Sequence, residues 1–176
     1  MRRKGPIPAC YWLIDDVLLA GEYPGAEEYQ EARDRLAKFL DAGIRTFIDL
    51  TEVGEGPPKY DNLLRAMAAE RGIDVRHVRH AVRNMDVPRE REHMMRILSA
   101  IREEIDTGRP VYVHCWGGIG RTGTVIGCWL VEEGMAGAAA IERIAELRAG
   151  SPACRTPSPE TDEQQRYVCE WLQGED

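Results

Sequence analysis

Residues 111–131, "VYVHCWGGIGRTGTVIGCWLV", decide how this chain folds. The apolar residues before Cys115 predict a short buried strand, and the apolar run after Gly123 predicts a helix. Four glycines lie between the two elements, within residues 117–123. Glycine permits the backbone angles of a tight turn and lets the main chain approach a ligand closely. The stretch therefore predicts a strand, a phosphate-binding turn and a helix whose N-terminus faces the phosphate.

Strand and helix patterns alternate on both sides of this stretch. Strands are predicted on either side of the turn at Asp15 and Asp16 and over residues 44–50, 73–82 and 110–115. Helices are predicted over residues 26–43, 60–70, 88–106, 121–133, 138–149 and 160–172. Such alternation is typical of an α/β fold with a central, mainly parallel sheet of about four or five strands and helices on both faces. No linker divides residues 1–176, and we expect one domain.

Composition and charge exclude several functions. The net charge is −7, so the chain lacks the overall basic character of nucleic-acid or anionic-membrane binding. No apolar run approaches the ~18 residues of a membrane span, and "MRRKGPIPAC" at residues 1–10 lacks the apolar core of a secretory signal. The five cysteines are scattered and form no C-x-x-C pair. We therefore expect neither a disulfide framework nor a structural zinc site, and a cytoplasmic location.

The glycines also fit a dinucleotide-binding fingerprint, since Gly118 to Gly123 satisfies G-x-G-x-x-G. That reading requires a second strand ending in an acidic residue about 20 residues further on. Residues 134–147, "GMAGAAAIERIAEL", have a helical pattern instead. A Walker A loop is also excluded, because the chain contains no G-K-[ST] sequence. The sequence thus disfavours a nucleotide as the source of the phosphate.

Cys115 and Arg121 give the loop its chemistry. Converging loop amides and a helix N-terminus bind a tetrahedral oxyanion, and the same field stabilises a thiolate at Cys115. The planar fork of Arg121 suits two phosphate oxygens. The simpler alternative makes Cys115 a small buried apolar residue beside a tight corner. That alternative leaves Arg121 and Thr122, at the start of the next helix, unexplained.

Residues 114–123, "HCWGGIGRTG", resemble H-C-x-x-G-x-x-R-[ST]-G, the signature of cysteine-dependent protein tyrosine phosphatases, including compact dual-specificity members of bacterial type. The resemblance implies that Cys115 attacks phosphorus and forms a phosphocysteine, that Thr122 helps the thiolate to leave, and that neither metal nor cofactor is needed. His114 would hydrogen-bond the backbone near Cys115. The phosphate oxygens would be held by Trp116, Gly117, Gly118, Ile119, Gly120 and Arg121.

The proton donor departs from the family pattern. Compact members commonly place an aspartate four residues before a proline, and here Asn84 holds that position before Pro88. Asp86 is the substitute that we predict as general acid. The alternative is that Asp86 only caps the helix after Pro88.

Several side chains leave alternatives open. Trp116 either stacks on an aromatic substrate or faces the core, Asp49 and Glu52 either orient Arg121 or are solvated, and Gln164 either positions water or lies on a helix surface. Residues 84–88, which include Asp86, are called the acid segment. Five arginines lie on either side of it and indicate a positively charged rim of the cleft: Arg76, Arg79, Arg83, Arg89 and Arg91.

The predicted substrate is a phosphorylated protein or a small aryl or alkyl phosphate. Residues 116–120 contain no lysine or arginine, which favours a singly phosphorylated group such as phosphotyrosine, with phosphoserine and phosphothreonine as alternatives. A different class of function, a catalytically weak phospho-binding module, is suggested by Asn84. Arsenate reduction is less favoured, because no resolving cysteine lies near Cys115 in the sequence.

Overall fold

The computed structural model describes residues 3–56 and 59–172. A five-stranded sheet in the order β1-β2-β5-β3-β4 forms its centre. β1 and β2 form an antiparallel hairpin, while β2, β5, β3 and β4 pair in parallel. This confirms the predicted α/β fold with a mainly parallel sheet. The strands are β1 (Cys10–Ile14), β2 (Leu18–Gly21), β3 (Thr46–Asp49), β4 (Arg76–Arg79) and β5 (Val111–His114).

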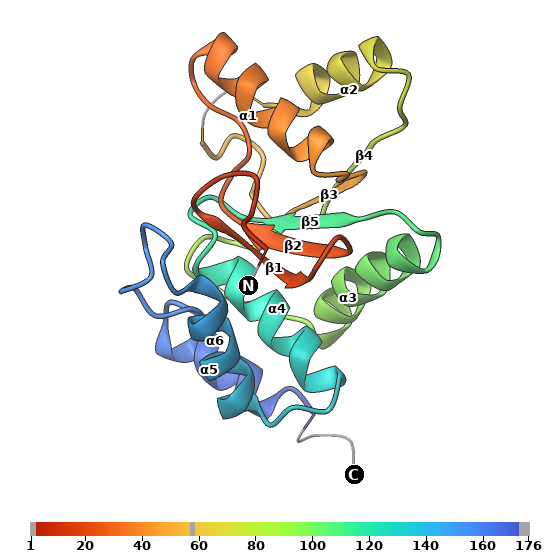
Figure 1. Ribbon diagram of the computed structural model, residues 1–176. Helices are drawn as coiled ribbons and strands as arrows, with labels where there is room; N and C mark the ends of the chain where they lie inside the picture. The colour runs from red at the N-terminus through yellow and green to blue at the C-terminus, as the bar shows by residue number, and fades with distance from the viewer. Residues whose placement is uncertain (1–2, 57–58, 173–176) are drawn as a thin grey trace.

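Helices cover both faces of the sheet (Figure 1). α1 and α2 lie on one face, and α3, α4, α5 and α6 lie on the other. Their bounds are α1 (Tyr29–Asp41), α2 (Asp61–Glu70), α3 (Arg91–Asp106), α4 (Gly120–Glu132), α5 (Gly137–Arg148) and α6 (Asp162–Glu170). None of the helices in the described part of the chain is long and apolar enough to cross a membrane.

Two elements differ in length from the prediction. β4 is an edge strand that pairs only with β3, from Thr46 opposite Arg76 to Asp49 opposite Arg79. The alternating pattern over residues 73–82 therefore extends beyond the residues that have a partner. α3 begins at Arg91, three residues after Pro88, because residues 82–90 form a loop instead of a first helical turn.

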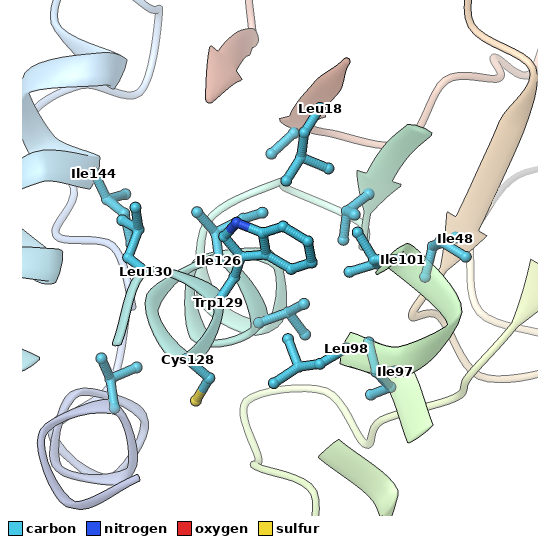
Figure 2. Packing of buried hydrophobic residues seen from close by; sticks show 14 of the residues in the cluster. Leu18, Ile48, Ile97, Leu98, Ile101, Ile126, Cys128, Trp129, Leu130 and Ile144 are labelled. Carbon is cyan, nitrogen blue, oxygen red and sulfur yellow. The ribbon is translucent and has the colours of Figure 1, made fainter. Parts of the chain in front are cut away.

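The residues of β5 alternate between two cores. Val111 and Val113 belong to the core under α3 and α4, whereas Tyr112 packs on the other face beside Phe39 of α1. Figure 2 shows the first core, where Trp129 of α4 lies among apolar side chains from α3, α5 and the sheet. Every residue of α4 from Gly120 to Val131 is buried. The helix that begins at the predicted phosphate loop is thus the central helix of the molecule.

The register of the sheet brings four loops together. Gly21 and Asp49 both lie opposite His114, and Arg79 lies opposite Asp49. The chain segments that leave β2, β3, β4 and β5 therefore emerge at one edge, where ligands bind in open α/β sheets.

Alanine substitutions at Ile97 and Met95 of α3 test how much this core contributes to stability. Ile97 is fully buried, whereas Met95 is 50% exposed on the same helix. We expect Ile97→Ala to lower the free energy of unfolding by about 2–5 kcal/mol, because it leaves a cavity, and Met95→Ala to change it by less than about 1 kcal/mol. Urea denaturation measures both values. An equal loss of unfolding free energy in both variants would contradict the burial of Ile97 in this core.

Candidate active site

The loop between β5 and α4 is tightly packed against β2. Gly118 has a φ of +69°, and a Cβ atom at this position would collide with the carbonyl carbon of Gly21 and the amide nitrogen of Glu22. At Gly117 the nearest atom to such a Cβ would be 3.8 Å away. Glycine is therefore required at 118 for two independent reasons, the backbone angle and the space.

This loop forms the floor and one wall of a cavity of about 250 Å³. Cys115 lies directly after β5 and is 3% exposed. α4 begins at Gly120 with no side-chain cap, so the N–H groups of its first turn have no partner within the helix. The cavity is lined by Asn84, Met85, Cys115, Trp116, Gly117, Ile119, Gly120, Arg121, Glu160 and Gln164. The cysteine and the helix N-terminus thus share one anion-binding space.

Arg121 is held by two other loops, the one after β3 and the one after β4. Its Nη1 donates to the carbonyl oxygens of Val82 at 2.9 Å and Leu50 at 3.3 Å, and to Oε2 of Glu55 at 2.8 Å. Its Nη2 donates to Oε1 of Glu55. Burial would raise the pKa of Glu55, but the hydrogen bonds from Arg121 keep it below the usual range. Because Glu55 binds the end of the guanidinium, the edge with Nε and one Nη2 N–H is left for a phosphate.

Sequence reasoning missed Glu55. It pointed to Asp49 and Glu52 as the carboxylates that might orient Arg121, since both follow β3. The signal that would have found Glu55 is its position between two glycines, Gly54 and Gly56, in the loop after β3. Both glycines have positive φ, which turns the chain back over the cavity.

Asp49 has other partners. Its carboxylate accepts hydrogen bonds from the Thr51 hydroxyl at 2.6 Å, from His77 Nε2 at 2.9 Å and from Arg79 at 3.0 Å. Burial alone would raise the pKa of Asp49, but these donors hold it well below its usual range. Glu52 accepts from the backbone N–H of Asn84 at 3.4 Å. Asp49 therefore joins β3 to β4, and Glu52 joins the loops that follow these two strands.

His114 fixes the start of the loop. Burial lowers its pKa to about 4, so the ring is neutral near pH 7. Nδ1 lies 3.0 Å from the carbonyl oxygen of Cys115, and Nε2 lies 2.7 Å from the hydroxyl of Tyr60. A neutral ring that donates from Nδ1 and accepts at Nε2 satisfies both contacts. The predicted hydrogen bond from His114 to the backbone near Cys115 is confirmed.

Trp116 stands at the entrance of the cavity. Its side chain is 45% exposed, and its ring lies 5.3 Å from that of Tyr23, measured between centroids. A Cβ at Gly56 would come within 2.6 Å of the indole. The ring therefore does not face the core, and its stacking on an aromatic substrate stays a prediction. The hydroxyl of buried Thr122 donates to the carbonyl of Gly21 at 3.4 Å.

Asn84 and Met85 line the cavity of Cys115, and Asp86 is not among its lining residues. Asp86 lines a neighbouring cavity, where its Oδ1 accepts from the N–H of Val87 at 2.9 Å. Met85 between them has a φ of +64°, a strained angle for a side chain of this kind. Glu160, before α6, is among the residues that line the Cys115 cavity, and sequence reasoning missed it.

Gln164 connects α6 to this segment. Its Oε1 accepts from the N–H groups of Glu160 and Thr161, both at 3.1 Å, and its Nε2 donates to the carbonyl of Asp86 at 3.1 Å. The side chain is fully buried, so Gln164 does not lie on the helix surface. It also packs against Gly120, where a Cβ would come within 2.9 Å of Oε1.

Residues 24–135 match the family model "Tc-R-P: Polymorphic toxin system, DSP-PTPase phosphatase". The chain belongs to this phosphatase family. The predicted resemblance to protein tyrosine and dual-specificity phosphatases is thereby confirmed. The match ends before Glu160 and Gln164, so the cavity of this DSP-PTPase phosphatase includes residues beyond the matched region.

Known proteins of the same kind resemble the chain. "Putative tyrosine phosphatase 067L" of Invertebrate iridescent virus 3 is 28% identical over 122 residues, which are 68% of this chain but only 44% of the viral protein. The structure of Tk-PTP in the active form is 26% identical, with a TM-score of 0.70 over 95% of this chain and 98% of that one. P. aeruginosa TpbA in complex with pTyr shares the fold at 16% identity, with a TM-score of 0.65 over 95% and 86% of the two chains.

The two neighbouring glycines of the phosphatase loop provide a matched test. We expect Gly118→Ala to destabilise the protein by about 1–3 kcal/mol or more and to weaken inorganic phosphate binding, because both the backbone angle and the Gly21 contact are lost. We expect Gly117→Ala to stay close to the wild type in both respects. Thermal unfolding and calorimetric titration measure the two effects. A Gly117→Ala variant as impaired as Gly118→Ala would contradict the loop geometry.

Proposed function

We propose that this phosphatase hydrolyses phosphotyrosine monoesters through a phosphocysteine intermediate on Cys115. The observation that supports this most is the shared cavity, in which Cys115 lies below a helix N-terminus and beside the free edge of Arg121. A phosphate over Cys115 would accept hydrogen bonds from the amides of residues 116–121 and from Arg121.

The reaction takes two steps. The Cys115 thiolate attacks phosphorus as the bond to the leaving oxygen breaks, and that oxygen receives a proton. Water then attacks the phosphocysteine, a proton leaves the water, and the thiolate departs. Arg121 stabilises the equatorial oxygens throughout, because Glu55 keeps its guanidinium in one orientation. We assign to Thr122 the stabilisation of the departing thiolate, which requires its hydroxyl to leave the Gly21 carbonyl.

The apolar lining favours an aryl phosphate. Trp116 and Ile119 of the phosphate loop and Met85 line the cavity, and apolar residues of this kind suit an aromatic ring. Residues 116–120 supply no further cation for a multiply phosphorylated head group. TpbA, which shares the fold, binds pTyr in its solved structure. We therefore propose phosphotyrosine in a protein, or a small aryl phosphate, as the substrate.

The proton donor is proposed to be Asp86. Its carboxylate reaches the Cys115 cavity if residues 84–86 rotate, and relief of the positive φ at Met85 favours such a rotation. Glu160 is the competing candidate, because it is the acidic residue among those that line the cavity.

We propose that residues 1–176 act as one phosphatase domain in a reducing cytoplasm. Gln164 and Glu160 complete a cavity whose other residues lie before residue 122, which supports a single functional unit. All five cysteines are free, which agrees with a reducing compartment.

Hydrolysis of phenyl phosphate tests the function directly. We expect Cys115→Ser to abolish turnover because the nucleophile is lost, and Cys154→Ser, which changes an exposed cysteine, to leave it unchanged. Release of inorganic phosphate measures the rate. A wild-type protein that binds the ester without turnover would instead support the phospho-binding module.

The same assay distinguishes the two acids. Loss of the true donor lowers kcat for phenyl phosphate by about 10²- to 10⁴-fold and removes the fall in rate at high pH. The effect on p-nitrophenyl phosphate is much smaller, because p-nitrophenolate leaves without a proton. We expect this pattern for Asp86→Asn and not for Glu160→Gln. The reverse result would assign the proton to Glu160.

A further inference from the structure

A second cavity, of about 290 Å³, adjoins the catalytic one. The two share residues 82–86 as a wall: Val82 lines the second cavity, while its carbonyl oxygen accepts from Arg121. Four basic side chains line the second cavity, namely Arg83, Arg89, His93 and Arg96. Apart from the proposed role of Asp86 and the Val82 carbonyl that holds Arg121, the residues of this cavity have no part in the mechanism described above.

The arginines of this cavity are poorly matched by carboxylates. Arg89 lies 3.8 Å from Asp86, and no ion pair of Arg83 or Arg96 is found among the described residues. Four arginines elsewhere in the molecule have close carboxylate partners: Arg33 with Glu70 at 2.5 Å, Arg71 with Asp41 at 2.6 Å, Arg76 with Glu104 at 2.7 Å and Arg102 with Glu132 at 2.8 Å. The residues that line this cavity thus include three arginines and two carboxylates, Asp86 and Glu90, and the excess of positive charge favours an anion.

The positive charge of Arg96 also acts on two nearby histidines, His80 and His93. His80 Nε2 is buried and has no hydrogen-bond partner among the described residues, which is rare for a buried polar atom. Burial lowers the pKa of His80, and the neighbouring His93 and Arg96 lower it further. Burial and Arg96 likewise lower the pKa of His93. Burial is the larger cause of both shifts, the nearby positive charges add to it, and Glu90 opposes the shift at His93.

The start of α3 adds to this field. Glu90 and His93, on either side of the first residue of α3, line the cavity, and no side chain caps the helix N-terminus. A sixteen-residue helix places partial positive charge at this end. Proteins commonly bind phosphate with arginine guanidinium groups and with the N–H groups of a helix N-terminus.

We propose that the cavity lined by Arg83, Arg89, His93 and Arg96 binds a second phosphate group, beside the one held over Cys115. Two sources can supply a phosphate that these side chains bind. The first is the second phosphate of a doubly phosphorylated substrate, and this source rests on the proposed phosphotyrosine hydrolysis. The second is free phosphate, bound next to the acid segment.

Inorganic phosphate titrated into the wild-type protein at constant ionic strength tests the site. NMR signals of the rings of His80 and His93 report the second cavity, and those of His114 report the loop of Cys115. We expect a saturable response of His80 and His93, with an affinity distinct from that read at His114. Arg96→Ala weakens the first affinity about tenfold and leaves the second unchanged, because one charge-assisted contact is lost.

Arg65→Ala is the matched control, since Arg65 is an exposed arginine on α2, on the opposite face of the sheet. We expect it to leave both affinities unchanged. A response of His80 and His93 that chloride reproduces, that does not saturate, or that Arg96→Ala does not weaken would overturn the proposal. The His114 response checks that each variant is folded.

Peptides that carry phosphotyrosine alone, or phosphotyrosine with phosphoserine at varied spacing, identify the source of the phosphate. A higher kcat/KM for a doubly phosphorylated peptide, lost in Arg96→Ala, assigns the site to the substrate. Equal values at every spacing, with the phosphate titration unchanged, assign it to free phosphate. The titration needs no turnover, so its result tests phosphate binding at the second cavity independently of hydrolysis at Cys115.

Discussion

The ion pair between Arg121 and Glu55 is the interaction on which the site depends. Arg121 is 3% exposed, and a guanidinium buried to this extent is costly unless its N–H groups are paired. Glu55 and the carbonyls of Leu50 and Val82 supply the partners. One side chain of α4 thereby joins the loops after β3 and β4, and its remaining edge is oriented before any phosphate binds. Preorganised donors of this kind need no rearrangement during the reaction.

The phosphate loop depends equally on close contact between backbones. Gly118 lies so near to Gly21 and Glu22 that no side chain fits between them. His114 holds the carbonyl of Cys115 from below, and Tyr60 holds His114. The loop is therefore supported by β2, by the residue that precedes α2 and by the buried helix α4. The acid segment is less constrained: Gln164 fixes the carbonyl of Asp86, while the Asp86 carboxylate pairs locally.

Features that depend on neighbouring residues or on a periodic pattern can be predicted from the sequence. The strand, the glycines and the Cys115–Arg121 spacing lie within a few residues of one another, so their pattern carries both the fold and the phosphate site. Glu55 was missed because its partner lies 66 residues away, across a loop whose path no periodicity describes. The direction of the Asp86 side chain likewise depends on the backbone angle at Met85 and on Gln164. Loop conformations of this kind follow from long-range contacts that a single sequence does not display.

The central claim is that a phosphate is transferred to Cys115 within the cradle that Arg121 completes. It is tested most directly by acid quenching of the wild-type protein during turnover of an aryl phosphate, followed by proteolysis and mass spectrometry. We expect the mass of one added phosphate on the peptide that contains Cys115, and its absence in Cys115→Ser. Phosphate on a different side chain, or continued turnover with none on Cys115, would contradict a transfer to Cys115.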